Sequence, residues 1–261
     1  MQPGDGPLFT ERTPRVVAAR KLTRRAHRDK TRRFLAEGPQ AVSEAVRLPD
    51  VEVFATPEAA ARYDDMLQGV RVHLATEQAL AGLSETVTPQ GIVAVCSFID
   101  VPLAGLRPSL VSVLVEANEP GNAGTVLRTS DAAGAGAVVL TDGSVDVYNG
   151  KCVRASAGSL FHLPVVRGGD VTEIIGTLRA AGVRVLAATG DGEADLFEEA
   201  RSGRLAEPTA WLFGNEARGL PDTVATLADA RVRVPIFGQA ESLNLAAAAA
   251  VCLYTTASSQ R

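Results

Sequence analysis

Short apolar runs recur through the second half of the chain, and the stretches between them carry apolar residues at helical spacing. Runs of this length are typical of strands buried on both faces, and their alternation with helices indicates a parallel sheet. The pattern predicts strands at 110–116, 137–141, 164–166, 183–188, 210–213 and 230–234, and helices near 122–133, 150–158, 170–181, 220–228 and 241–257. The predicted fold class is therefore α/β with a parallel sheet.

The first hundred residues predict a smaller α/β domain over 10–100, preceded by a disordered start at 1–10. The pattern at 15–47 is helical, includes residues 33–38 and is interrupted at Gly38 and Pro39. Further elements are a strand at 51–56, a helix at 57–67, a strand at 70–75, a helix at 76–83 and a strand at 92–98. Proline and glycine then mark residues 101–109 as a linker to a second domain at 110–261.

Composition narrows the class of protein. Of 261 residues 46% are hydrophobic and 21% charged, as in ordinary globular proteins. The most apolar stretch, 243–253, is shorter than the ~20 residues of a membrane span, and the start lacks the apolar core of a signal peptide. Three separated cysteines without a CxxC pair indicate reduced thiols and a cytoplasmic protein. Three scattered histidines give no metal-ligand spacing, so no metal is expected.

The charge is distributed unevenly. Residues 11–33 hold ten Lys and Arg against Glu11 and Asp29, a net charge of +8, which leaves −12 for the rest of the chain. A basic arm on an acidic body is the electrostatic pattern of a protein that binds a phosphate backbone, although a solvated basic helix gives the same pattern. The candidate RNA-binding residues are Arg20, Arg24, Arg25, Arg28, Arg32 and Arg33.

Three polar segments, 118–128, 213–220 and 235–244, each follow an apolar run that predicts a strand. In the first, Asn122 is expected to cap a helix that contains Arg128. In the second, Glu216 is a loop carboxylate beside Gly214. In the third, Ser242 is the expected helix cap. Pockets of parallel sheets lie where such loops leave the strands, so the three segments predict one shared site.

In their order and in their amino-acid sequences, these segments resemble the motifs of the SpoU (TrmH-like) branch of the SPOUT RNA methyltransferases. The resemblance is strong over 111–257 and looser over 10–100, which resembles the RNA-binding domain of the two-domain members. It implies transfer of a methyl group from S-adenosylmethionine to a ribose 2′-hydroxyl of RNA. It also implies a trefoil-knotted methyltransferase domain and a homodimer.

The resemblance further implies the role of each site residue. The catalytic candidates are Arg128, Asn122, Glu216, Ser242 and Asn244, and the cofactor-binding candidates are Gly214, Asn215, Gly219, Val234, Ile236 and Leu243. Family accounts make the arginine a general base. Because a guanidinium normally stays protonated, we expect Arg128 to bind the phosphate of the reacting nucleotide unless another cation or desolvation depresses its pKa.

The target indicated is ribosomal RNA, specifically 23S rRNA, because many ribosome-directed relatives carry an N-terminal domain of this size. A tRNA methyltransferase of the same family and a non-catalytic RNA-binding or assembly protein are the alternatives. Two departures from relatives are Ile236, where many have Met, and Ala157, where some carry a second Arg. The glycines at 134 and 136 precede a strand, which excludes a dinucleotide fingerprint, and there is no P-loop motif.

Overall fold

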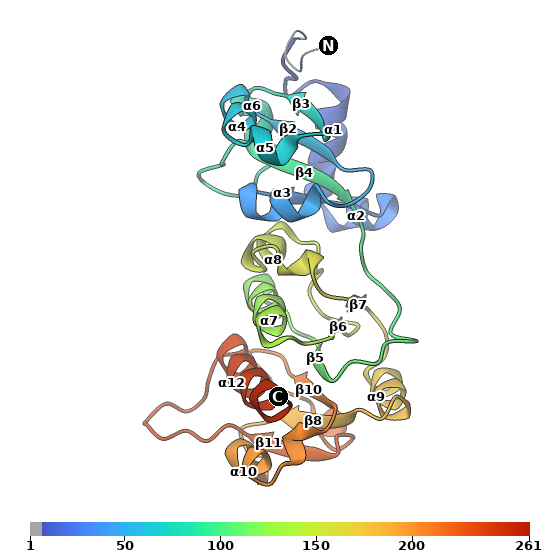
Figure 1. The fold of residues 1–261 in the computed structure, drawn as a ribbon, viewed down its shortest axis with the longest axis vertical. Coiled ribbons are helices and arrows are strands. Elements are labelled where there is room, and N and C mark those ends of the chain that lie inside the picture. Colours follow the sequence, from blue (N-terminus) through green and yellow to red (C-terminus); the bar gives the residue numbers. More distant parts are fainter. Residues whose placement is uncertain (1–6) are drawn as a thin grey trace. The chain divides into compact units, whose positions relative to one another are not determined.

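The computed structural model describes residues 7–261, and the chain divides into two compact units (Figure 1). The first comprises the described residues up to Ile99 together with Tyr148–Phe161, and the second comprises Asp100–Val147 and His162–Arg261. The disorder expected for residues 1–6 lies outside the described residues. Phe9 was expected to be disordered too, but it pairs with Ala75 beside the first sheet.

The first unit is built on a mixed four-stranded sheet in the order β1-β4-β2-β3. Strand β4 pairs antiparallel with β1 and β2, whereas β2 and β3 are parallel. The strands are β1 Arg33–Glu37, β2 Glu52–Ala55, β3 Arg71–Leu74 and β4 Ile92–Ser97. The helices are α1 Pro14–Arg20, η1 Lys21–Thr23 (3-10), α2 Arg25–Thr31, α3 Pro39–Ala45, α4 Pro57–Arg62, α5 Asp64–Leu67 and α6 Glu77–Ala81.

Strand β1 corrects the helix predicted over residues 33–38. Its centre is a run of three buried apolar residues, which is short enough to fit either a helix or a strand. Pairing with β4 decides between them, since Phe34 lies opposite Cys96 and Ala36 opposite Ala94. Gly38, at φ 87°, then turns the chain from β1 into α3.

The segment Tyr148–Phe161 packs on one face of this sheet. It contains α8 Gly150–Ala155 and the 3-10 helix η2 Ser159–Phe161. The ring of Phe34 lies 4.6 Å from that of Tyr148 and 6.0 Å from that of Phe161, measured between centroids. On the opposite face, Leu35 packs with Val16 of α1. The helix predicted at 150–158 is therefore shorter than expected and lies in the first unit, although its sequence position had put it in the second domain.

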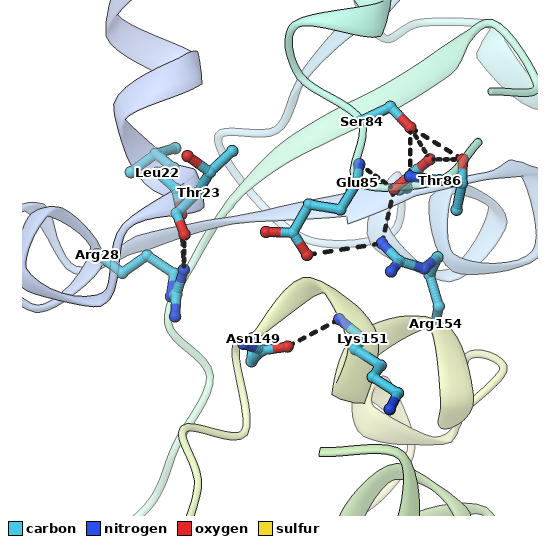
Figure 2. A network of polar contacts seen from close by, with 10 residues as sticks. Leu22, Thr23, Arg28, Ser84, Glu85, Thr86, Asn149, Lys151 and Arg154 are labelled. Atoms are coloured by element: carbon cyan, nitrogen blue, oxygen red, sulfur yellow. Dashed lines mark hydrogen bonds and ion pairs between the residues drawn. The ribbon is translucent and has the colours of Figure 1, made fainter. Parts of the chain in front are cut away.

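Glu37, at the end of β1, is the centre of a polar network that joins α8 to the sheet (Figure 2). Its carboxylate accepts hydrogen bonds from the hydroxyls of Ser84 and Thr86 and from the backbone N–H of Glu85, and it pairs with Arg154 at 2.8 Å. Burial raises the pKa of Glu37, but these hydrogen bonds and the charge of Arg154 together hold that pKa below its ordinary value.

The second unit is a seven-stranded sheet in the order β7-β6-β5-β10-β8-β11-β9, in which every adjacent pair is parallel. Its strands are β5 Leu110–Leu114, β6 Ala137–Leu140, β7 Val165–Arg167, β8 Arg184–Ala188, β9 Ala194–Asp195, β10 Thr209–Phe213 and β11 Ala230–Arg233. Its helices are α7 Pro120–Ala133, α9 Val171–Ala180, α10 Leu196–Arg201, η3 Arg204–Ala206 (3-10), α11 Asp222–Ala225 and α12 Leu245–Ser259. The α/β class with a parallel sheet is confirmed, while β9 and α10 were not predicted.

Helices cover both faces of this sheet. Successive residues of a strand point to opposite sides, so neighbouring residues of one strand contact different helices. Val113 packs with Ile174 of α9 on one side. On the other side, the Ser112 hydroxyl hydrogen-bonds α7, and the indole N–H of Trp211 donates to Thr256 of α12 at 2.9 Å. None of the helices in the described part of the chain is long and apolar enough to span a membrane.

Candidate active site

A cavity of about 340 Å³ lies at the carboxyl ends of β8, β10 and β11, which are adjacent in the second sheet. Its walls are residues 188–190 after β8, residues 213–219 after β10, and parts of the chain between 232 and 248. Among the predicted site residues, it is lined by Gly214, Asn215, Glu216, Gly219, Val234, Ile236, Ser242 and Leu243. Residues 188–190 were not among the predicted site residues. Thr189 and Gly190 directly follow a predicted strand, as the polar segments included in that prediction also do.

A larger hollow of about 650 Å³ lies in the first unit beside β3, α4 and α5. Its walls are mainly apolar, and it contains none of the predicted catalytic residues. Size alone therefore does not identify the site. The smaller cavity is the candidate because polar loops from three strands meet there.

The loop after β10 is closed by glycines and by one asparagine. The backbones of Asn215 and Gly219 exchange two hydrogen bonds, at 3.0 and 2.8 Å. A Cβ on Gly214 would overlap the backbone of Gly219 and Leu220. The buried amide of Asn215 donates to the carbonyl of Glu116 and accepts from the backbone N–H groups of residues 217 and 218. Gly214 and Asn215 thus shape the wall of the cavity, a role visible without any ligand.

Glu216 extends from this loop to the beginning of α7. Its carboxylate accepts hydrogen bonds from the backbone N–H groups of Asn118 (3.1 Å) and Glu119 (3.2 Å) and from the side-chain amide of Asn122 (3.3 Å). The first and second polar segments therefore meet, although none of residues 118–128 lines the cavity. The N-terminal end of a helix favours negative charge, which suits a carboxylate here.

The cap of α7 differs from the prediction. Glu119, not Asn122, is the N-cap, and its carboxylate accepts from the backbone N–H of Asn122 at 2.8 Å. The signal for this assignment was Pro120, since proline is favoured at the first position of a helix. With the cap supplied by Glu119, the amide side chain of Asn122 is available to bind Glu216.

Arg128 lies on the exposed side of α7. Within the described residues its guanidinium forms no hydrogen bond or ion pair, and Glu216 does not contact it. The structure therefore brings Glu216 together with Asn122 but not with Arg128. An exposed, unpaired guanidinium is suited to a phosphate ligand.

The third polar segment also changes its cap. Asn244, not Ser242, is the N-cap of α12, and its side-chain oxygen accepts from the backbone N–H of Ala247 at 2.7 Å. Asn244 thus precedes the helix, where the prediction had put it inside the first turn. Ser242 lies two residues earlier, is exposed and lines the cavity. Asn244 therefore caps α12, and Ser242 forms part of the cavity wall.

Apolar side chains form the rest of the cavity wall. Ile236 and Leu243 are each 38% exposed and line the cavity together with Val234. Phe237 is exposed as well and stacks on Phe197 of α10. Large apolar side chains left in water are a surface that a ligand can cover favourably.

The arginines of the basic arm, residues 11–33, differ in how exposed they are. Arg28 is only 3% exposed, and its guanidinium donates to the carbonyl groups of Leu22 and Thr23. Arg33 is partly exposed and pairs with Glu52. Arg28 therefore stabilises the chain between α1 and α2 and is withdrawn from the proposed RNA surface. The candidates that remain exposed are Arg20, Arg24, Arg25 and Arg32.

The other reactive side chains lie apart from the cavity. Cys96, Cys152 and Cys252 are buried and form no disulfide among the described residues, and desolvation raises the pKa of Cys96 to about 12. Such a thiol stays protonated at neutral pH and is a poor nucleophile. Across residues 7–261, no group of three or more His, Cys, Asp or Glu is arranged to hold a metal ion.

A parallel sheet with a polar and apolar cavity at the carboxyl ends of its strands defines an α/β protein with a small-molecule site in its second unit. The chain belongs to the SpoU rRNA Methylase family, which it matches over residues 109–254. Residues 13–94 match the MRM3-like substrate binding domain.

Relatives cover nearly the whole chain. The chain is 39% identical to the 23S rRNA (guanosine(2553)-2′-O)-methyltransferase RlmP of Bacillus subtilis, over 95% of this chain and 97% of that protein. The AdoMet-bound rRNA methyltransferase from Sinorhizobium meliloti has a TM-score of 0.83 at 32% identity and covers 97% of this chain and 98% of its own. The SpoU methyltransferase AviRb from Streptomyces viridochromogenes, in complex with AdoMet, has a TM-score of 0.82 at 31% identity, covering 95% and 98%.

Proposed function

We propose that this protein transfers a methyl group from S-adenosylmethionine to a ribose 2′-hydroxyl of 23S rRNA. The observation that carries the proposal is the composition of the cavity. Apolar Val234, Ile236 and Leu243 line it beside the carboxylates of Glu216 and Glu241, and no Lys or Arg is among its described lining residues. An apolar wall suits an adenine ring, and carboxylates without a Lys or Arg beside them in the cavity wall suit a cation such as a sulfonium.

The residues present therefore fit S-adenosylmethionine, which supplies an electrophilic methyl group on its sulfonium sulfur. Val234, Ile236 and Leu243 would hold the adenosine part, and backbone groups of the loop containing Gly214, Asn215 and Gly219 would border it. Positioning supplies much of the rate acceleration in a reaction with so good a leaving group. Ser242 and Asn244 stand where α12 begins, beside this cavity.

Arg128 acts on the RNA in this proposal. Its exposed guanidinium binds the phosphate next to the reacting ribose and lowers the pKa of the 2′-hydroxyl through its positive charge. Glu216 and Asn122 fix the loop after β10 against the start of α7. Because α7 also carries Arg128, this connection positions the arginine relative to the cavity wall.

The organisation of the whole protein is part of the proposal. Residues 10–100 bind RNA, residues 101–109 link the domains, and residues 110–261 form a trefoil-knotted methyltransferase domain that pairs as a homodimer. Tyr254 on α12, which is more than half exposed, supports an interface on that helix. The enzyme is proposed to work in the cytoplasm, where ribosomal RNA is assembled. Sedimentation analysis of wild type and Tyr254→Arg tests the dimer.

Transfer of radiolabelled methyl groups to unmodified 23S rRNA and, separately, to tRNA tests the reaction, using wild type and Arg128→Ala. We expect label on 23S rRNA at a ribose that resists alkaline cleavage, and a large loss in the variant. Label on tRNA alone would replace the substrate and keep the chemistry. A protein that binds RNA without transferring label would be a non-catalytic binding protein.

A further inference from the structure

Arg32, Phe98 and Tyr148 of the first unit form a stacked column that reaches the surface, and Phe34 packs against its inner end at a tilt. The guanidinium carbon of Arg32 lies 4.7 Å from the centre of the Phe98 ring. Phe98 stacks on Tyr148 with centroids 4.0 Å apart and planes inclined by 16°, and Tyr148 packs on Phe34 at 4.6 Å. Phe34 and Tyr148 are buried, whereas Arg32 is exposed.

The backbone fixes both outer members of the column. Arg32 ends α2 at φ 54°, a left-handed conformation that residues other than glycine seldom adopt. Its carbonyl accepts a hydrogen bond from the backbone N–H of Phe98 at 2.8 Å. The hydroxyl of Tyr148 accepts from the backbone N–H of Ile99, also at 2.8 Å. The main chain of Arg32 is therefore joined to that of Phe98, and the Tyr148 ring is anchored to the next residue along that chain.

A guanidinium in this position has a chemical use that a lysine would lack. Its N–H groups lie in its plane, so they can keep hydrogen bonds while the outer planar face receives another flat group. Proteins hold unpaired RNA bases by stacking them on aromatic rings and on arginine planes. Arg24 and Arg25, exposed at the other end of α2, lie on the same basic arm, and cations there attract RNA phosphates.

We propose that Arg32, supported by Phe98, is a stacking platform for one unpaired nucleobase of the RNA substrate. The proposal rests on the proposed function, since it assumes that the first unit binds RNA. It assigns base contact to one arginine of the arm and leaves phosphate contact to the others. The base is held by its planar face, so this subsite recognises an unpaired base and not a particular sequence.

The test compares two RNAs of equal charge. Dissociation constants are measured by fluorescence anisotropy, with full-length protein and without cofactor, for a short oligouridylate and for an abasic ribose-phosphate oligomer of the same length. Wild type is expected to bind the RNA with bases about tenfold more tightly, because one base stack contributes this order of affinity. Arg32→Lys keeps the charge and loses the plane, so we expect this preference to vanish while binding of the abasic oligomer stays unchanged.

The matched control is Arg12→Lys, an exposed arginine of the same arm that lies over no ring, and it should retain the preference. Circular dichroism and thermal melting verify that each variant is folded. A 2-aminopurine base in the RNA gives a second readout, since its fluorescence should be quenched by wild type and not by Arg32→Lys. If Arg32→Lys keeps both the preference and the quenching, or if wild type shows neither, the platform is wrong while RNA binding stands. If wild type binds neither RNA, the proposed function fails with it.

Discussion

Glu37 in the first unit and Glu216 in the second are both carboxylates that accept several hydrogen bonds from residues distant in the sequence. Their surroundings differ, because Glu37 is mostly buried and Glu216 is exposed. Glu37 is 8% exposed at its side chain and pairs with a cation, Arg154. Glu216 is exposed and accepts only from neutral groups, two backbone N–H groups and the Asn122 amide. A neutralised, buried carboxylate is a cross-link, whereas an exposed carboxylate at a cavity keeps a charge that a ligand can use.

The largest expected effect is on stability, from Glu37→Ala. Removing the Glu37 carboxylate leaves Arg154 with only the longer contact to Glu85, at 3.9 Å, and leaves the hydroxyls of Ser84 and Thr86 with only each other. Breaking a largely buried pair lowers the free energy of unfolding by about 3 kcal/mol, measured by urea denaturation. The matched control is Arg47→Ala, because Arg47 is 72% exposed in its pair with Glu44 and should contribute less than about 1 kcal/mol. Equal losses in the two variants would remove the distinction between cross-link and surface pair.

Glu216→Gln is expected to show the opposite profile. The amide keeps the shape but loses the charge and one acceptor, so the N-terminus of α7 is held less well. We expect kcat/KM for methyl transfer to fall about 100-fold, equivalent to ~2.7 kcal/mol, with unfolding free energy changed by less than about 1 kcal/mol. Glu198→Gln, an exposed carboxylate on α10, is the control and should change neither quantity. A stability loss like that of Glu37→Ala, with activity retained per folded molecule, would make Glu216 a structural cross-link as well.

The same two carboxylates show how far the sequence leads. Glu216 was identifiable because it follows a strand and stands beside glycines, and such local patterns predict where loops leave a sheet. Glu37 was not, because its partners Ser84 and Arg154 are 47 and 117 residues away and only the packing of α8 brings them together. The predictions of the two helix N-caps were wrong for a different reason. At each helix start two polar residues stood two or three positions apart, and their local chemistry alone does not choose between them.

The prediction of a helix over residues 33–38, where the structure has β1, was wrong for yet another reason. A run of three apolar residues satisfies both periods, and its pairing with β4 depends on residues some sixty positions later in the chain, near Cys96. The seven-stranded parallel sheet was easier to predict, because each strand is a separate apolar run followed by a helix. The predictable parts are thus those in which sequence neighbours settle the structure.

The stability that Glu37 contributes should depend on pH. The pKa of Glu37 lies below its ordinary value of 4.5, so its stabilisation is fully present above the pKa of the unfolded chain and is lost as pH falls through the folded pKa. The difference in unfolding free energy between wild type and Glu37→Gln should therefore be constant near neutral pH and shrink as the pH falls below the ordinary glutamate pKa. Glu52, Glu199 and Asp229 also have lowered pKa values, but they are common to both proteins and cancel in the difference. A difference that grows in acid would contradict the assignment.

The smallest expected effect distinguishes the cap of α12 from the cavity wall beside it. Asn244→Ala removes the acceptor of the Ala247 N–H and should lower the unfolding free energy by about 1 kcal/mol. Asn244→Asp should restore stability, since aspartate caps equally well. Ser242→Ala, two residues away, should change stability by less than about 0.5 kcal/mol because Ser242 is exposed and does not cap the helix. Since Ser242 lines the cavity, its variant should instead raise the dissociation constant of S-adenosylmethionine in calorimetry. The reverse assignment, with Ser242 carrying the stability, would mean that α12 begins two residues earlier in solution and that the cavity has a different wall.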